Sequence, residues 1–196
     1  MKRIAYILCW MALSPLHATA FTAEQMVKAV QETSASIKVM SCGFVQTRWL
    51  TLLDDSVQSC GRLLYRAPAD LKWEYTEPEW WCLEVSDGKA SVIGRENDGS
   101  ERLFSGIAGV MLDCMSGKCL TDRRMFTVRM TEETDAWRAC LTPVRKDMSR
   151  IFSSVTLVFD PGTCLLRTLE MLEAGGNVTR IVISDVSING EYETDR

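Results

Sequence analysis

Apolar and polar side chains alternate along the stretch from Gly61 to Pro78, GRLLYRAPADLKWEYTEP. Leu71, Trp73 and Tyr75 occupy every second position, and charged or hydroxyl side chains stand between and after them. Successive side chains of a β-strand point to opposite faces, so this pattern predicts a strand with one large apolar face and one polar face. The apolar face needs a covering layer, made either of other side chains or of a ligand.

The same alternation recurs from about Val39 onward and is interrupted by turn sequences such as Asp87-Gly88 and Asn189-Gly190. These dipeptides tolerate the positive φ angles that tight hairpins need. The later apolar positions are Trp81, Leu83 and Val85, then Phe126, Val128 and Met130, then Trp137, Ala139 and Leu141, then Val155, Leu157 and Phe159, followed by the run 165–172 and by Ile181 and Ile183. Consecutive strands joined by short turns predict a mainly β protein, an antiparallel sheet with one dry face and one wet face.

Two segments depart from this alternation and predict helices. In the first, FTAEQMVKAVQETSASIKVM, Thr22 and Gln25 have the spacing of a capping box, and Met26 and Val30 follow at helical spacing. The second segment is apolar and contains two glycines, and we predict a short helix or loop over about Gly106–Met115. We expect these two helices to cover the dry face of a single domain.

The start of the chain has the pattern of a secretory signal peptide. Two basic residues precede an apolar run that is too short to span a bilayer comfortably, and Ala18-Thr19-Ala20 offers small residues at a cleavage site. We expect cleavage after Ala20, which divides the chain into a signal peptide (1–20) and one mature domain (21–196).

The composition of the mature domain argues against several classes of function. It has 20 Lys and Arg against 26 Asp and Glu, a formal charge of −6, so clustered basic residues for nucleic acid are not expected. The one histidine, His17, leaves with the signal peptide, which removes Ser-His-Asp and Cys-His nucleophile systems. Motifs for phosphate binding or a nucleophile elbow are also missing, and a chance carboxylate pair is the one enzymatic arrangement still conceivable. We therefore predict a binding protein that is not an enzyme and has no cofactor.

Seven cysteines remain in the mature domain, and this odd number leaves at least one without an intrachain partner. Cys114 and Cys119, in CMSGKC, could close a small loop as a disulfide, because export places the chain in an oxidising compartment. Zinc is the competing use of cysteine, but the sequence has neither a Cys-x-x-Cys pair nor a histidine in the mature domain. We expect no metal site.

A series of short motifs resembles the LolA family of periplasmic carriers of outer-membrane lipoproteins. The motifs are Phe44-Val45-Gln46, Ser59-Cys60-Gly61, Leu71-Lys72-Trp73 between Pro68 and Pro78, Asp87-Gly88, and the closing segment 159–189. They match the family's Phe-x-Gln, its Ser-x-Gly strand, its hydrophobic-x-Trp strand between two prolines, and its final hairpins. Their order covers nearly the whole mature domain.

The resemblance implies an antiparallel sheet curled into an incomplete barrel, with the helices as a lid over an apolar cavity. It implies a periplasmic protein, which we expect to be a monomer, that binds acylated lipoproteins released by an inner-membrane ABC transporter and passes them to an outer-membrane acceptor. We expect the following residues to line the concave face and contact acyl chains: Leu63, Tyr65, Leu71, Trp73, Tyr75, Trp81, Leu83, Phe126, Val128 and Trp137.

One position departs from the family. LolA proteins often carry an arginine directly before the first proline, and that arginine is thought to bond to the lid. Here Ala67 takes that position, and Arg66 lies one residue earlier, on the opposite face of a strand. The lid latch is therefore absent or built differently. Two other interpretations stay open: a carrier or sensor for another acylated molecule of the cell envelope, and an aromatic face that is ordinary protein core.

Overall fold

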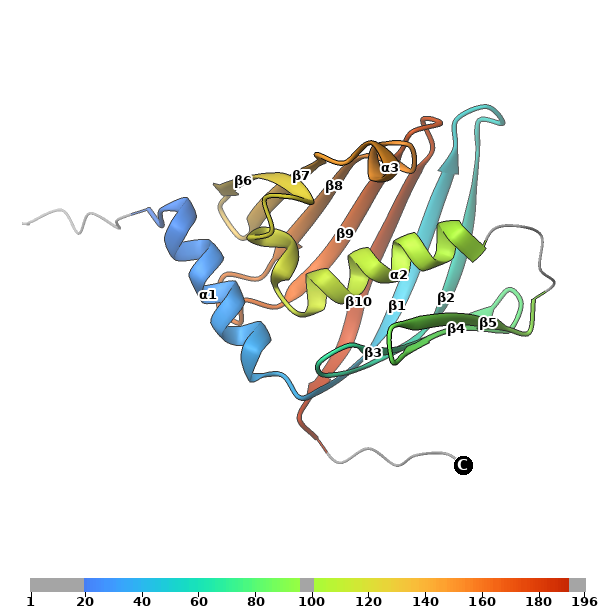
Figure 1. The fold of residues 1–196 in the computed structure, drawn as a ribbon, viewed down its shortest axis with the longest axis horizontal. Coiled ribbons are helices and arrows are strands. Elements are labelled where there is room, and N and C mark those ends of the chain that lie inside the picture. Colours follow the sequence, from blue (N-terminus) through green and yellow to red (C-terminus); the bar gives the residue numbers. More distant parts are fainter. Residues whose placement is uncertain (1–19, 96–100, 191–196) are drawn as a thin grey trace, which may run out of the picture.

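The computed structural model describes residues 20–95 and 101–190, with only the backbone of residues 101–105. The predicted signal peptide lies outside the described residues, apart from Ala20. In this part of the chain, ten strands form one antiparallel sheet in the order β5-β4-β3-β2-β1-β10-β9-β8-β7-β6 (Figure 1). The sheet is curved, and the edge strands β5 and β6 do not pair, so it does not close into a barrel. The predicted fold class is confirmed.

The strands form two groups that meet where β1 pairs with β10. The first group is β1 (Val39–Leu50), β2 (Asp55–Arg66), β3 (Asp70–Glu77), β4 (Trp81–Ser86) and β5 (Lys89–Ile93), and the second is β6 (Phe126–Glu132), β7 (Trp137–Pro143), β8 (Phe152–Phe159), β9 (Leu166–Glu173) and β10 (Val178–Ile188). Asp87 and Gly88 both have positive φ, as their turn chemistry predicts. The sequence pattern missed β5, because this edge strand is exposed at most positions and has no dry face.

Helix α1 (Ala23–Ser36) lies at the β6 end of the sheet (Figure 1). Its predicted capping box is confirmed: the backbone N–H of Gln25 donates to the Thr22 hydroxyl at 3.2 Å, and the backbone N–H of Thr22 donates to the Gln25 side-chain oxygen at 2.8 Å. Met26 and Val30, the two apolar residues at helical spacing, are buried. The cap therefore sets the start of a helix whose one apolar side packs into the core.

Helix α2 (Glu101–Met115) covers the dry face and contacts β3, β4 and β5 (Figure 1). The sequence predicted a shorter helix starting at about Gly106, and that start is wrong. The first helical turn, residues 101–105, mixes charged and apolar residues, and Gly106 and Gly109 are poor helix formers. The apolar pattern of the sequence therefore revealed only the later part of the helix. Two further short helical segments, η1 (Lys118–Leu120) and α3 (Lys146–Ser149), were not predicted.

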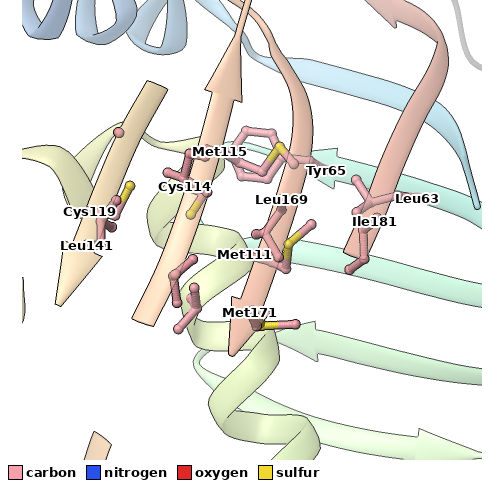
Figure 2. Close-up of a cluster of buried hydrophobic side chains, with 14 of the residues drawn as sticks. Leu63, Tyr65, Met111, Cys114, Met115, Cys119, Leu141, Leu169, Met171 and Ile181 are labelled. Carbon is pink, nitrogen blue, oxygen red and sulfur yellow. The ribbon is translucent and has the colours of Figure 1, made fainter. Parts of the chain in front are cut away.

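The core fills the space between the later part of α2 and the central strands. Figure 2 shows Met111, Cys114 and Met115 of α2 clustered with side chains of the sheet, among them Leu169 and Met171 of β9. All five side chains are buried. The later part of α2 is therefore anchored to the sheet by apolar packing.

Gly61 lies where the pairing of β2 with β3 changes register, between Cys60 and Gly61. A Cβ atom on Gly61 would stand 1.9 Å from the backbone carbonyl oxygen of Glu74 on β3. That oxygen belongs to the neighbouring strand and has no freedom to move aside. The glycine of the Ser-x-Gly motif thus permits the close approach of β2 and β3.

We predict that Gly61→Ala lowers the free energy of unfolding by about 2–3 kcal/mol, because the strands must separate to admit the methyl group. Gly175→Ala is the matched control, since a Cβ there would meet no atom within 4 Å, and its effect should stay within about 0.5 kcal/mol. Urea unfolding followed by tryptophan fluorescence measures both. Equal unfolding midpoints for the two variants would contradict the steric explanation.

Candidate functional site

A cavity of about 400 Å³ lies among β1, β2, β3, β4, β9, β10 and the α2 residue Ile107. Its size falls in the lower part of the range of roughly 300–1,000 Å³ typical of small-molecule sites. Its lining has two parts, an aromatic and aliphatic wall and a band of polar side chains.

The wall is built from Trp73 and Tyr75 of β3 and Trp81 and Leu83 of β4, with Ile107 opposite on α2. Register pairs Tyr75 with Trp81 and Trp73 with Leu83, so alternation along both strands turns all four side chains to the same face. The Tyr75 and Trp81 rings stack with centroids 4.0 Å apart, and Trp73 stacks on the other side of Tyr75 at 5.8 Å. The pairing of β3 with β4 thus fixes a rigid apolar surface.

The structure separates the ten predicted ligand-contacting residues into two groups. Trp73, Tyr75, Trp81 and Leu83 line the cavity. The other six, which belong to the core or pack against it without lining this cavity, are Leu63, Tyr65, Leu71, Phe126, Val128 and Trp137. All ten lie on the dry face, as their alternation predicts, and contact with acyl chains stays a prediction for each of them.

The polar band was not predicted from the sequence. Its charged centre is an ion pair between Arg48 of β1 and Glu173 of β9, in which Arg48 Nε and Nη2 donate to the two carboxylate oxygens at 2.9 and 2.8 Å. Thr179 and Asn177 also donate to Glu173, at 3.2 and 3.3 Å. The alternation along β1 could have revealed Arg48. Arg48 stands two positions after Gln46 and four after Phe44, so its side chain points to the dry face.

The surroundings of Glu173 fix its ionisation. Burial alone would raise the pKa of this carboxyl, but the hydrogen bonds and charge of Arg48 and the hydrogen bonds of Asn177 and Thr179 outweigh it and lower the pKa below its ordinary value. The ion pair therefore stabilises the fold above the ordinary pKa of a glutamate, and this contribution is lost as the pH falls through the lowered pKa. At neutral pH the cavity lining contains this compensated pair and a second cation, Arg95.

Tyr75 supplies a neutral hydroxyl to the band. Its O–H group donates a hydrogen bond to the side-chain oxygen of Gln46, with 2.9 Å between the two oxygens. Burial raises the pKa of Tyr75 above its ordinary value, although the hydrogen bond to Gln46 and the charge of Arg95 lower it in part. The hydroxyl therefore keeps its proton and holds Gln46 in place.

The cysteines and the expected latch position lie away from the cavity lining. All seven cysteines of the described residues are free thiols, so the predicted Cys114–Cys119 disulfide is not formed here and stays a prediction. A hydrogen bond with Cys119, together with burial, raises the pKa of the Cys114 thiol well above its ordinary value. Arg66 and Ala67 are both exposed, so the arginine that faces the cavity from β1 is Arg48.

Residues 20–95 and 101–190 contain neither a metal-binding cluster nor a helix able to span a membrane. They contain no group of three or more His, Cys, Asp or Glu side chains arranged to hold a metal ion. None of the helices described there has the length and apolar character required to cross a membrane.

Comparison with solved structures finds the same fold at low sequence identity. MucB matches with a TM-score of 0.52 and 13% identity over 88% of this chain and 61% of that chain. MucB in complex with MucA(peri) matches with a TM-score of 0.50 and 13% identity over 89% of this chain and 58% of that chain. A LolA superfamily protein from Nitrosomonas europaea matches with a TM-score of 0.45 and 11% identity over 88% and 96%. The chain thus spans less than two thirds of the length of MucB.

No curated protein matches this sequence. A family model described as outer membrane lipoprotein carrier protein LolA matches residues 35–196, which is most of the chain. The protein therefore belongs to the LolA family.

Proposed function

We propose that this protein is a periplasmic carrier that binds the acyl chains of lipoproteins in the cavity under α2 and moves them from the inner to the outer membrane. The observation that carries the proposal is the cavity itself, which lies between α2 and the dry face of a LolA-family sheet. Its wall of Trp73, Tyr75, Trp81, Leu83 and Ile107 offers hydrocarbon and aromatic surface to a ligand.

The free energy of exposing lipid to water explains why such a carrier is needed. Burial of one methylene group is worth roughly 0.8 kcal/mol, so a sixteen-carbon chain in water costs on the order of 10 kcal/mol. A lipoprotein with several chains cannot cross an aqueous compartment unaided. A protein with an apolar cavity lowers that cost without any chemical step.

Helix α2 is the element that controls access to the cavity in this proposal. Its later residues Met111, Cys114 and Met115 are buried in the core, whereas Ile107 is only half-buried and faces the cavity. The cavity of about 400 Å³ is small for several acyl chains. Several acyl chains therefore enter only when α2 moves away from β3 and β4.

Export to the periplasm is supported by the environment of Phe21. Its backbone N–H donates to a carboxylate oxygen of Glu132 at 2.8 Å, and its ring packs edge-on against Trp137 at 5.1 Å between centroids. Cleavage after Ala20 would turn this N–H into an ammonium group, and the bond to Glu132 would become a charge-assisted one. The proposed mature N-terminus is thus already placed beside a carboxylate.

The proposed partners are acylated lipoproteins, an inner-membrane ABC transporter that releases them and an outer-membrane acceptor. The second candidate function is a carrier or sensor of another acylated molecule of the cell envelope. The polar band of Arg48 and Glu173 favours keeping it, because a cavity for hydrocarbon alone has no need of an ion pair.

We predict that the mature protein binds a triacylated lipopeptide and does not bind the same peptide without its acyl chains. Native mass spectrometry of the protein mixed with each peptide measures this directly, because the mass of the complex identifies the ligand. Binding of neither peptide would contradict the carrier proposal and return the aromatic face to the role of ordinary core. Equal binding of both would assign recognition to the peptide instead of the lipid.

We predict that Ile107→Glu weakens binding of the triacylated lipopeptide at least about ten-fold, because an acyl chain would have to desolvate the new carboxylate. Ile93→Glu makes the same substitution on β5, where the side chain is 45% exposed and does not line the cavity. This control should bind as the parent protein does. Titration of tryptophan fluorescence compares the three proteins, and a similar loss in both variants would show that the effect is not local to the cavity.

A further inference from the structure

The concave side of β1 changes from apolar to polar along its length. Phe44 is buried in the core, and the next residues on the same face, Gln46 and Arg48, line the cavity. Gln46 lies opposite Ser59 of β2, and Arg48 lies opposite Thr179 of β10. With Glu173 of β9, the polar band therefore crosses four neighbouring strands, β2, β1, β10 and β9.

Arg48 is held on one edge only. Its Nε and Nη2 atoms donate to Glu173, and no hydrogen bond from Nη1 is found among the described residues. Glu173 accepts from Arg48, Asn177 and Thr179, so its oxygens are occupied. The guanidinium group is thereby fixed in orientation while one of its N–H edges remains available.

The neutral side chain of Gln46 is likewise held at one atom and has donors left over. Its side-chain oxygen accepts the hydroxyl proton of Tyr75, and its Nε2 group makes no hydrogen bond among the described residues. The Tyr75 hydroxyl thus orients the amide as Glu173 orients the guanidinium. Two positions along a strand are roughly 7 Å apart, so one ligand can reach both sets of N–H groups.

Trp73 lines the same cavity and carries a further donor without a partner in the described part of the chain. Its side chain is buried, and its indole Nε1 has no hydrogen-bond partner among the described residues. A buried donor without an acceptor is costly, and such groups call for an explanation. The available polar groups of Gln46 and Arg48 are donors, and the buried Trp73 N–H beside them also lacks an acceptor in the described structure, so a complementary ligand brings acceptors.

We infer that the cavity binds the carbonyl of an acyl ester or acyl amide in this polar band, with the attached hydrocarbon against Trp81, Leu83 and Ile107. At Arg48 a neutral acceptor fits better than an anion, because the charge of Arg48 is already compensated by Glu173. A second cation, Arg95, also lines the cavity, 5.6 Å from the centroid of the Trp81 ring, so an anionic probe belongs in the test. The inference rests on the proposed function, since it names the part of an acylated cargo that the cavity recognises in addition to its hydrocarbon. Gln46 and Arg48 then select acylated molecules over plain hydrocarbon.

The test uses three probes of equal chain length: methyl laurate, dodecyl methyl ether and laurate. The ether replaces the ester carbonyl by a methylene group, and laurate carries a negative charge. Affinity is measured by titration of tryptophan fluorescence in the mature protein. We expect the ester to bind about ten-fold more tightly than the ether and no less tightly than laurate, as expected for one or two hydrogen bonds to oriented donors.

Gln46→Met removes one donor and retains the length of the side chain. We expect the ester-to-ether ratio to fall to about three-fold or less, with binding of the ether retained. The matched control is Gln58→Met on β2, because Gln58 is exposed and does not line the cavity, and its ratio should equal that of the parent protein. Should Gln46→Met fail to fold without its Tyr75 contact, Arg48→Lys gives the second measurement. It keeps a cation beside Glu173, removes the free N–H edge, and should lower the same ratio.

The outcomes distinguish the inference from the proposed function. Equal binding of ester and ether by the parent protein, with water satisfying the donors, would overturn the inference and leave an acyl-binding cavity. Tighter binding of laurate than of the ester would overturn the assignment to a neutral carbonyl. An unchanged ratio in both Gln46→Met and Arg48→Lys would remove these residues from recognition. Failure of all three probes to bind would instead count against the proposed function.

Discussion

The dry face of the sheet has to be covered, and the chain has few residues with which to cover it. Nine of the ten described strands, all except β5, present buried apolar side chains to one side, whereas α2 is a single helix and α1 lies at the β6 end (Figure 1). Where the later part of α2 packs, the core is filled (Figure 2). Where its packing is looser, a cavity remains between Ile107 and the β3–β4 pair. The cavity thus follows from the mismatch between a wide apolar face and a narrow cover.

The polar band shows how such a cavity can be selective. Hydrophobic attraction has no direction and does not distinguish one acyl chain from another. Directional donors do, provided that partners hold them in place. Glu173 and the Tyr75 hydroxyl fill that role for Arg48 and Gln46. The lowered pKa of Glu173 keeps the ion pair intact at neutral pH, so the donors remain oriented with or without a ligand.

The sequence predicted those features that depend on local periodicity. Alternation identified the dry face and placed Trp73 and Trp81 on it, and the Thr22–Gln25 spacing predicted the helix cap. Alternation could not show which dry-face residues border a cavity. Leu71 and Trp73 point to the same face of β3, and only the path of α2 determines that Trp73 lines the cavity and Leu71 does not. Glu173 was missed for a related reason: its partner Arg48 is 125 residues away in the chain, and only the return of β10 and β9 beside β1 brings them together.

The central claim is that acyl chains occupy the space between α2 and the β3–β4 pair. The most direct measurement is the nuclear magnetic resonance spectrum of the protein bound to a triacylated lipopeptide with a nitroxide spin label on one acyl chain. The account predicts strong broadening of the signals of Trp73, Leu83 and Ile107, and little broadening at Val45 and Val182, which lie exposed away from the cavity lining. Broadening centred on Val45 and Val182, with the cavity signals unchanged, would contradict it.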